Sequence, residues 1–324
     1  PFLMTYREHR SVGGFLFDYF EGHQEISHGM FSTADIQLNR YDRFPMLKYD
    51  LLPKQLLHEG TCNEENFFSP EYLDHKDALS VHTESYFRRL LNSDLNPKEV
   101  RKIGFPLSQQ LIDREQRIAQ GTIQNCYHAF NHGISINIAG GTHHAYADHG
   151  EAFCLLNDQA IAASHLIRKG LIKKALIIDL DVHQGNGTAS IFQEDSSVFT
   201  FSVHGAANYP FKKEESDLDL PLPKGCNDLE YLALLEEYLD PLIEEIKPDF
   251  IFYLSGVDIL ESDRLGTLGL TLNGCKERDH KVLNLAHSKG IPIQCSMGGG
   301  YSKDIRVIVE AHANLFRIAQ YLYD

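Results

Sequence analysis

Acids and a histidine follow an apolar stretch near the middle of the chain. The run 175–178 is typical of a buried strand in a parallel sheet, and it leads directly into Asp179, Asp181 and His183. An i, i+2 spacing in an extended segment points two side chains the same way, so Asp181 and His183 could bind one metal ion. Considered alone, an Asp-x-His pair after a strand is more often a helix-capping carboxylate beside a packed histidine.

Polar residues also follow three other predicted strands. They are His143 and His144 after Ile134–Ile138, Asp258 after Asp249–Gly256, and Tyr301 after Ile291–Met297. Because the carboxyl ends of parallel strands lie at one edge of a sheet, residues far apart in the sequence can meet there. Each of these residues alone has an ordinary explanation as a cap, a turn or a packed side chain. Their repetition at four strand ends favours one shared site.

Two carboxylates and an imidazole predict a catalytic metal site. Asp181, His183 and Asp258 would supply three ligands and leave a coordination position open, as catalytic zinc requires. Fe²⁺ is also possible, since this ligand set is not exclusive to zinc. A metal held there would polarise a carbonyl group and lower the pKa of a bound water.

The remaining polar residues have the functional groups needed for amide hydrolysis. His143 or His144 could remove the proton from water, and the other could protonate the leaving amine. Tyr301, on a glycine-rich loop, could donate its hydroxyl to the oxyanion. The residues therefore predict metal-assisted amide hydrolysis without a nucleophilic serine or cysteine.

The segments between these motifs predict alternating helices and strands. Helices are expected at Asn39–Glu59, Leu107–Phe130 (eased near Gly121), Phe153–Arg168, Leu229–Ile246, Lys276–Lys289 and Asp304–Tyr321. A strand is expected at Ser197–His204, and Ala78–Asn92 should run from a short strand or turn into a helix. No repeat or linker divides this pattern. We therefore predict one three-layer α/β/α domain with a mostly parallel sheet.

Composition narrows the classes of function. The net charge of -15 and the lack of a basic run argue against direct nucleic-acid binding. No apolar run approaches the roughly 20 residues of a membrane span, so we expect no membrane insertion and a cytoplasmic location. The six cysteines form no Cys-x-x-Cys pair, and we expect reduced thiols.

The first 29 residues carry no motif to which chemistry can be assigned. They mix aromatic residues with acids and glycines. A short helix or hairpin packed on the domain is the simplest interpretation, and a contact with a partner or a second copy in a homo-oligomer is the alternative. We therefore predict an N-terminal extension at 1–29 and a catalytic domain at 30–324.

Several motifs together resemble one known family. They are Gly140-Gly141-Thr142-His143-His144, Phe153-Cys154-Leu155-Leu156-Asn157-Asp158, the segment 178–187 (IDLDVHQGNG), Gly256-Val257-Asp258, Asp263-Arg264-Leu265-Gly266 and Gly299-Gly300-Tyr301. This order resembles the zinc-dependent histone deacetylases, a family that includes acetoin-utilisation proteins and acetylpolyamine amidohydrolases and has an arginase-like α/β fold. The segments 43–49, 103–106 and 258–266 look most like the class IV branch and its bacterial relatives, which hints at long acyl chains.

The resemblance implies a role for each site residue. It implies zinc ligands at Asp181, His183 and Asp258, a catalytic pair of His143 with Asp179, a second acid/base at His144 with its partner Asn186, and a carbonyl-polarising Tyr301. It also implies a structural potassium ion held by Asp179, Ser202 and the main-chain carbonyls of Asp181 and His183. The substrate-binding residues would be Phe153 and Tyr209, lining an acyl-lysine tunnel, together with Gly299 and Gly300.

Two residues depart from the family pattern. Asn186 stands where most zinc deacetylases have Asp, and an amide cannot stabilise an imidazolium by charge, so His144 should be more readily neutral. Ala152 stands where many relatives have Gly. We expect an enzyme that removes an acyl group from a lysine peptide or protein. The alternatives are hydrolysis of a small acylated amine such as an acetylpolyamine, or a catalytically silent protein that binds an acylated ligand.

Overall fold

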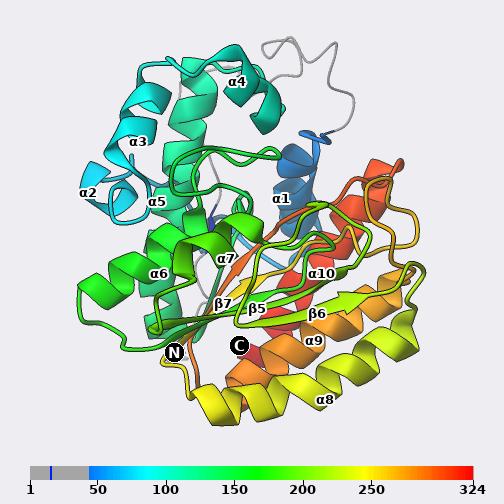
Figure 1. Cartoon of the computed structure of the whole chain (residues 1–324). Helices are drawn as coiled ribbons and strands as arrows, with labels where there is room; N and C mark the ends of the chain where they lie inside the picture. Colours follow the sequence, from blue (N-terminus) through cyan, green and yellow to red (C-terminus); the bar gives the residue numbers. More distant parts are fainter. Residues whose placement is uncertain (1–14, 17–43, 324) are drawn as a thin grey trace, which may run out of the picture.

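The computed structural model describes residues 15–16 and 44–323 (Figure 1). Its strands are β1 (Phe15–Leu16), β2 (Phe67–Phe68), β3 (Ile134–Asn137), β4 (Ala175–Asp179), β5 (Val198–Gly205), β6 (Leu218–Leu222), β7 (Phe250–Leu254) and β8 (Ile293–Ser296). Its α-helices are α1 (Lys48–Glu59), α2 (His75–Ala78), α3 (Glu84–Leu91), α4 (Pro97–Ile103), α5 (Gln109–His132), α6 (Asp158–Arg168), α7 (Asn186–Phe192), α8 (Asp228–Ile246), α9 (Leu272–Lys289) and α10 (Ile305–Tyr323), and a 3₁₀ helix spans Glu64–Asn66.

The strands form one sheet in the order β2-β1-β3-β8-β7-β4-β5-β6, and every pairing within it is parallel. β4 pairs with β5 on one side and with β7 on the other. The chain continues from β4 to β5 and β6 on one side, and later adds β7 and β8 on the other. The order of the strands therefore reverses next to β4, and open α/β sheets place their ligand sites at such a reversal.

Helices cover both faces of the sheet (Figure 1). Leu176 and Ile178 of β4 belong to a core cluster with residues of α1, α8, α9 and α10. Ala175 and Ile177 point to the opposite face and join a second cluster with residues of α3, α5 and α6. Alternate strand residues thus serve two cores, which explains why β4 is apolar at successive positions. The single three-layer α/β/α domain with a parallel sheet is confirmed.

Some predicted boundaries were wrong. The structure has no helix at 44–47, and α1 begins only at Lys48, while 39–43 lie outside the described residues. α5 continues without interruption through the buried Gly121 and ends at His132, with Gly133 as its C-cap. α6 begins at Asp158 rather than Phe153, because the Asn157 side chain accepts a hydrogen bond from the Ala160 amide and caps the helix.

The segment Ala78–Asn92 holds the end of α2, a turn and α3, so the predicted turn running into a helix is confirmed and the alternative of a short strand is not. Other elements escaped prediction because their sequence signals are short. β6 and α7 have only 5 and 7 residues. The predicted extension 1–29 lies outside the described residues except for Phe15–Leu16, which pair with β2 and β3, and its boundary stays a prediction.

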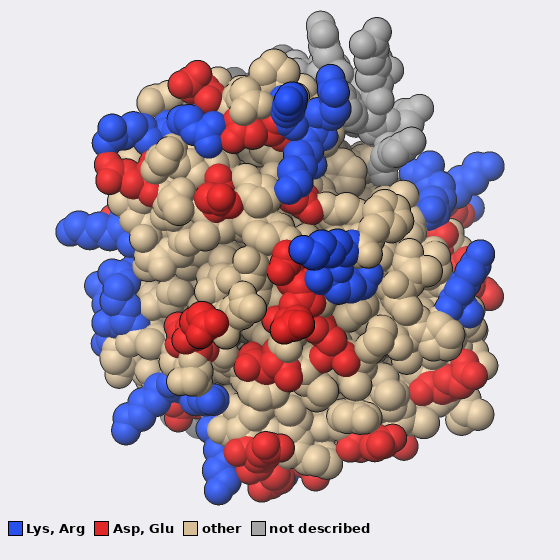
Figure 2. All heavy atoms as spheres, in the orientation of Figure 1, with Lys and Arg blue, Asp and Glu red and all other residues tan. Residues whose placement is uncertain are grey.

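Three further properties of the described residues bear on the predictions made from the sequence. No described helix has the length and apolarity needed to cross a membrane. All six cysteines are buried and none forms a disulfide. In Figure 2 acidic side chains gather near the middle of the visible face, and basic side chains do not form a broad continuous area on it.

A buried arginine joins the loops that follow β4 and β7. Arg278 of α9 is fully buried, and its Nη1 donates to the carbonyl oxygens of Leu180 (3.2 Å) and Gly256 (2.5 Å). Its Nη2 donates to the carbonyl of Ser255 at 3.2 Å and lies 2.8 Å from Oδ1 of Asp279. The guanidinium therefore satisfies carbonyl groups that the strands have left without partners, and the neighbouring carboxylate balances its charge.

We expect Arg278→Met to lower the free energy of unfolding by about 3–5 kcal/mol, because it leaves buried carbonyl groups unpaired and the Asp279 carboxylate without its cation. Chemical denaturation measures the change. The matched control is Arg88→Met, since Arg88 pairs with Glu84 on the surface of α3, where both side chains are 71% exposed. Equal stabilities of the two variants would contradict the proposed importance of the buried arginine.

Candidate metal centre and active site

The loops after β3, β4, β7 and β8 bring the predicted site residues together. Asp181, His183 and Asp258 are all buried, and one ligand atom from each lies within 4.8 Å of the others. His183 Nδ1 lies 3.0 Å from Asp181 Oδ1 and 3.2 Å from Asp258 Oδ2. These residues come from the ends of two neighbouring strands, so the reversal of strand order beside β4 forms the cluster.

The donor atoms that this cluster leaves available suit a divalent cation. Asp181 Oδ2 accepts from the Gly299 amide at 2.8 Å, and Asp258 Oδ1 accepts from the Val182 amide at 3.0 Å. Asp258 Oδ2 is buried and has no hydrogen bond, although His183 Nδ1 lies near it. A buried carboxylate oxygen without a hydrogen bond is costly unless a cation neutralises it. The two oxygens and one imidazole nitrogen suit zinc and related metals.

The pKa shifts in the cluster show how strongly its groups interact. Burial acts to lower the pKa of His183, but the neighbouring carboxylates of Asp181 and Asp258 outweigh it and raise the pKa to about 10. Burial and the neighbouring Asp181 raise the pKa of Asp258 to about 7. One proton on His183 thus partly balances two carboxylates, and a divalent cation bound there would replace that proton.

Two adjacent histidines border the cluster and have different partners. His143 Nδ1 lies 2.7 Å from Asp179 Oδ2, and His144 Nδ1 lies 2.6 Å from Asn186 Oδ1. Burial acts to lower the pKa of His143, but the Asp179 carboxylate outweighs it and raises this pKa. Burial, with the charges of His143 and His183, holds the pKa of His144 well below its ordinary value. The first ring therefore favours the imidazolium and the second the neutral imidazole.

Hydrogen bonds of its main chain hold Tyr301 beside the cluster. Its amide donates to Asp263 Oδ2 at 2.6 Å, and its carbonyl accepts from Arg264 Nε at 2.9 Å. The ring centroid lies 6.5 Å from that of His183, and burial raises the pKa of the phenol well above its ordinary value. The hydroxyl consequently stays protonated and able to donate. Asp263 and Arg264 belong to a motif that carries the family resemblance, but the sequence did not indicate their contacts with Tyr301.

The glycines in these loops make room for the carboxylates. A Cβ on Gly256 would collide with Asp181 Oδ2, and a Cβ on Gly299 would collide with Asp258 Oδ2. Gly300 has φ 152°, a conformation that side chains rarely adopt. Gly299 and Gly300 were predicted to bind substrate. Gly299 touches the carboxylate–histidine cluster, since its amide donates to Asp181 Oδ2, whereas a Cβ on Gly300 would meet Val257 and Ile308. Substrate binding by these glycines stays a prediction.

The two predicted tunnel residues lie on different sides of the site. The Phe153 ring packs 5.0 Å from Phe105 and 6.3 Å from Tyr301, measured between centroids. The Tyr209 ring packs edge-on to His144 at 5.3 Å. Ala152 (φ 45°) and Phe153 (φ 69°) have the left-handed backbone conformation, so the turn that presents Phe153 is strained at both residues. The Ala152 departure from Gly therefore falls where glycine would relieve strain.

Three further residues near the site belong to the family-like segments 43–49 and 103–106, but the sequence indicated no role for any of them. Lys48 is fully buried at the start of α1, and its Nζ donates to the carbonyl of Gly298 at 3.1 Å. Burial lowers the pKa of Lys48 to about 8, although Asp258 and Asp181 act against this. Phe44 and Phe105 line the site beside Phe153. A lysine at the first turn of an amphipathic helix gives no sequence signal of burial.

The predicted potassium ligands also lie together. Asp179 of β4 is paired in register with Ser202 of β5, next to the turn that bears Asp181 and His183. The Ser202 hydroxyl lies 3.0 Å from His204 Nδ1. A potassium ion at this place stays a prediction.

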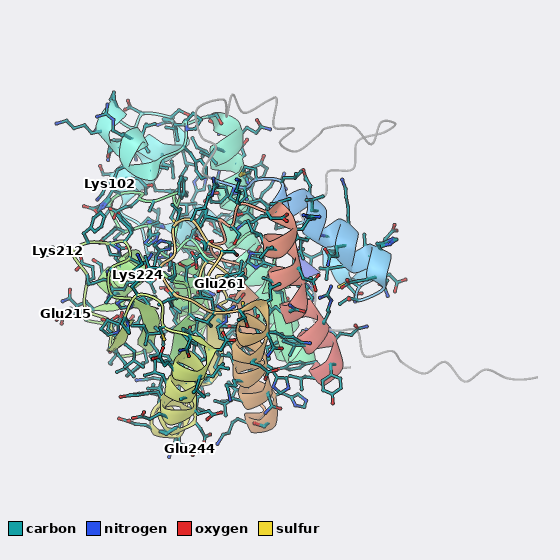
Figure 3. The ribbon with its side chains drawn as sticks, turned by 90° about the vertical axis from the view of Figure 1, so that its right-hand side faces the viewer. Lys102, Lys212, Glu215, Lys224, Glu244 and Glu261 are labelled. Carbon is teal, nitrogen blue, oxygen red and sulfur yellow. The ribbon has the colours of Figure 1, made fainter. Side chains whose placement is uncertain are left out.

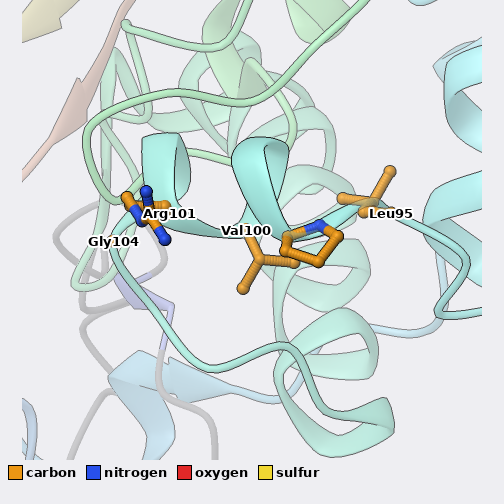
Figure 4. A pocket seen from close by; sticks show the side chains of 5 residues that line it. Leu95, Val100, Arg101 and Gly104 are labelled. Carbon is orange, nitrogen blue, oxygen red and sulfur yellow. The ribbon is translucent and has the colours of Figure 1, made fainter.

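A separate pocket lies beside α4 (Figure 4). Its lining residues are Leu95, Pro97, Val100, Arg101 and Gly104. Arg101 is the only charged residue among them, so the pocket lacks the converging polar groups of the metal centre. We do not assign the candidate site to it.

The parallel fold and the carboxylate–histidine site match a known class of hydrolase. Residues 43–316 match the family model described as the histone deacetylase domain. The chain belongs to the histone deacetylase family, as its motifs indicated, and it is a hydrolase of the deacetylase type.

The chain is also similar to individual proteins along most of its length. An uncharacterized protein of Picosynechococcus sp. is 43% identical over 281 residues, which cover 87% of this chain and 94% of that protein. Histone deacetylase 2 of Arabidopsis thaliana is 31% identical over 299 residues, covering 88% and 77%. Acetoin utilization protein AcuC of Staphylococcus aureus is 25% identical over 311 residues, covering 89% and 80%.

Solved structures show the same fold. An HDAC homolog complexed with SAHA has a TM-score of 0.76 and 23% identity, covering 95% of this chain and 84% of that one. An HDAC homolog from Aquifex aeolicus has a TM-score of 0.74 and 24% identity with the same coverage. These likenesses concern the fold alone.

We expect Gly299→Ala to weaken Zn²⁺ binding at least tenfold, because the added methyl group occupies the position of Asp258 Oδ2 and displaces a ligand atom. Isothermal titration of metal-depleted protein measures the affinity. The matched control is Gly60→Ala, which has positive φ but no atom near the added methyl group. Equal Zn²⁺ affinity of both variants would show that Asp258 does not contribute a ligand.

Proposed function

We propose that the chain is a Zn²⁺-dependent deacylase that hydrolyses the amide between an acyl group and a lysine side chain. The observation that carries this proposal is the buried cluster of Asp181, His183 and Asp258, with one carboxylate oxygen lacking a hydrogen bond, beside two histidines and a tyrosine. When held by these three residues, Zn²⁺ would supply a Lewis acid that polarises the acyl carbonyl and lowers the pKa of a bound water. Fe²⁺ suits the same ligands.

The two histidines divide the proton transfers. Neutral His144 has its Nδ1 bonded to Asn186, so its Nε2 is available to remove a proton from the attacking water. His143, whose imidazolium is favoured by Asp179, donates a proton to the nitrogen of the leaving amine. Attack by the water forms the carbon–oxygen bond first and turns the carbonyl oxygen into an oxyanion. The carbon–nitrogen bond breaks when this oxyanion collapses, and the products are a carboxylate and a free amine.

Tyr301 stabilises the developing negative charge. Its buried phenol donates a hydrogen bond to the carbonyl oxygen as that oxygen becomes an oxyanion. Asp263 and Arg264 fix its main chain, which limits the positions that the side chain can reach. This positioning is supported by the family membership and by the buried environment of the phenol.

The finer assignments belong to the same proposal. Phe153 and Tyr209 would flank the acyl-lysine tunnel, with Gly299 and Gly300 beside the reacting carbonyl. Asp179, Ser202 and the main-chain carbonyls of Asp181 and His183 would hold a structural potassium ion. The class IV-like motifs, the catalytic domain at 30–324 and a cytoplasmic location are proposed with them, and homo-oligomerisation is left open.

A small acylated amine is the second candidate substrate. The net charge of -15 and the acidic side chains gathered on one face (Figure 2) favour a cationic ligand, and acetylated polyamines carry such charge. The similarity to an acetoin utilization protein is compatible with small-molecule chemistry. Direct comparison of acetylspermidine with acyl-lysine peptides separates the two candidates.

Metal removal tests the reaction type. We expect the metal-depleted protein to lose more than about 99% of its hydrolysis of acyl-lysine peptides and to recover it on addition of Zn²⁺. Peptides with acetyl, longer acyl and myristoyl groups should be assayed, with acetylspermidine alongside. Full activity after metal depletion would overturn the proposed mechanism, and ligand binding without turnover on every substrate would favour a binding protein.

Substitutions separate catalytic residues from metal ligands. We expect Tyr301→Phe to lower kcat by about 10²–10³-fold and His143→Ala by about 10²–10⁴-fold, while both variants retain metal. Asp181→Ala should lose the metal itself, because it removes a ligand oxygen. Elemental analysis of the purified variants provides the comparison, and metal loss from Tyr301→Phe would assign that residue a different role.

A further inference from the structure

Glu151 is a buried carboxylate outside the groups assigned above. It lies in the loop between β3 and α6 and is 5% exposed. Its amide donates to the Cys154 carbonyl at 2.9 Å, and the Cys154 amide donates back to the Glu151 carbonyl at 2.9 Å. This isolated antiparallel bridge fixes the main chain at Glu151 and so determines where its side chain can reach.

One oxygen of Glu151 accepts hydrogen bonds from two of the residues that contact the His144 ring, Asn186 and Tyr209. Asn186 Nδ2 donates to Glu151 Oε1 at 3.2 Å, and the hydroxyl of Tyr209 donates to the same oxygen. Asn186 in turn lies 2.6 Å from His144 Nδ1, and the Tyr209 ring packs edge-on to the His144 ring. The carboxylate is therefore connected to His144 through two intervening residues, Asn186 and Tyr209.

The carboxylate determines which way the Asn186 amide faces. An ionised carboxylate only accepts hydrogen bonds, so the Asn186 amide group must present its NH₂ to Glu151 and its oxygen to His144. The amide oxygen accepts, so His144 must carry its proton on Nδ1. His144 Nε2 is then left without a proton, as a general base requires. The Tyr146 hydroxyl supports this orientation, since it accepts from Asn186 Nδ2 at 3.0 Å and donates to Glu214.

The other oxygen of Glu151 faces the surface. Lys102 Nζ forms an ion pair with Oε2, and His149 Nε2 lies 3.5 Å from it. Lys102 is half-exposed and lies at the edge of the molecule in Figure 3. Burial acts to raise the pKa of Glu151, but hydrogen bonds from His149 and Lys102 outweigh it, so the pKa is lowered and the carboxylate is ionised.

We infer that Glu151 is a positioning residue that fixes the Asn186 amide and the Tyr209 ring, and thereby holds His144 in the tautomer with a free Nε2. This inference rests on the proposed function for its effect on catalysis. It also accounts for the departure at Asn186. An Asp at this position would place a second carboxylate where Asn186 Nδ2 now lies 3.2 Å from Glu151 Oε1, and the two charges would repel each other.

The first test compares removal of the Glu151 contacts with Asn186 and Tyr209, which face the site, with removal of its surface contact with Lys102. We expect Glu151→Ala to lower kcat about 10–100-fold with KM and metal content nearly unchanged, and Glu151→Gln to lower it less because an amide oxygen can still accept. The control is Lys102→Met, which removes the outward ion pair alone and should change kcat less than about twofold. Equal kcat for Glu151→Ala and the wild-type protein would overturn the inference, and melting temperatures identify a variant that has merely lost its fold.

Exchanging the amide and the carboxylate between positions 186 and 151 tests the contact between these two side chains. Asn186→Asp alone should lower kcat at least tenfold, and adding Glu151→Gln should restore kcat to within about threefold of wild type, because the Gln amide can donate to the new carboxylate. In an Asn186→Ala background, Glu151→Ala should lower kcat less than it does in the wild-type background, because only its contact with Tyr209 remains to be lost. Additive losses in both pairs would overturn an action through Asn186.

The tautomer of His144 gives a measurement that does not depend on turnover. Nitrogen-edited NMR of the histidine rings should show His144 protonated at Nδ1 in the wild-type protein. In Glu151→Ala it should show the two neutral tautomers, protonated at Nδ1 or at Nε2, in exchange. If the wild-type protein hydrolyses no acyl substrate but this change appears, the proposed function fails and the positioning role stands. An unchanged His144 tautomer in Glu151→Ala would overturn the positioning role whatever the activity.

Discussion

The burial of three carboxylates at one end of the sheet is the constraint on which the rest of the site depends. Asp179, Asp181 and Asp258 are 4%, 1% and 0% exposed, and an uncompensated charge at such depth is costly. Main-chain amides and the His143 ring satisfy most of their oxygens, and a single oxygen of Asp258 is left without a hydrogen bond. The protein thus satisfies most of these carboxylate oxygens, and the proposed metal ion would balance the remaining charge.

Close approach of the strand ends makes this arrangement possible. The carboxylates meet only because glycines leave room for them and because Arg278 satisfies the carbonyl groups of the same loops from beneath. The arginine has its own buried counter-ion, Asp279, so it adds little net charge to the cluster. Stability and site geometry therefore share the same contacts, and a change that loosens the loops also changes the ligand positions.

The class of fold and the meeting of the polar residues could be predicted because they follow from strand polarity. Apolar runs that end in Asp181 or Asp258 indicate parallel strands, and parallel strands share a carboxyl edge. The start of α6 and the continuity of α5 at Gly121 could not be predicted. The apolar periodicity is the same whether or not a residue is helical there, and tertiary contacts decide whether the helix includes it. Lys48 and Glu151 escaped notice for a related reason. Their burial depends on partners distant in sequence, and a charged residue in a loop or at a helix start carries no sign of it.

The adjacent histidines show how one loop supports two different proton affinities. His143 and His144 have similar burial, and their ring centroids are only 4.1 Å apart, so depth alone cannot distinguish them. Their partners do: a carboxylate contacts the first ring and an amide contacts the second. A charge on His143 also repels a proton on its neighbour, which increases the difference. Placing the second carboxylate at Glu151, beyond the amide, keeps the orientation of His144 fixed without stabilising its charged form through direct contact.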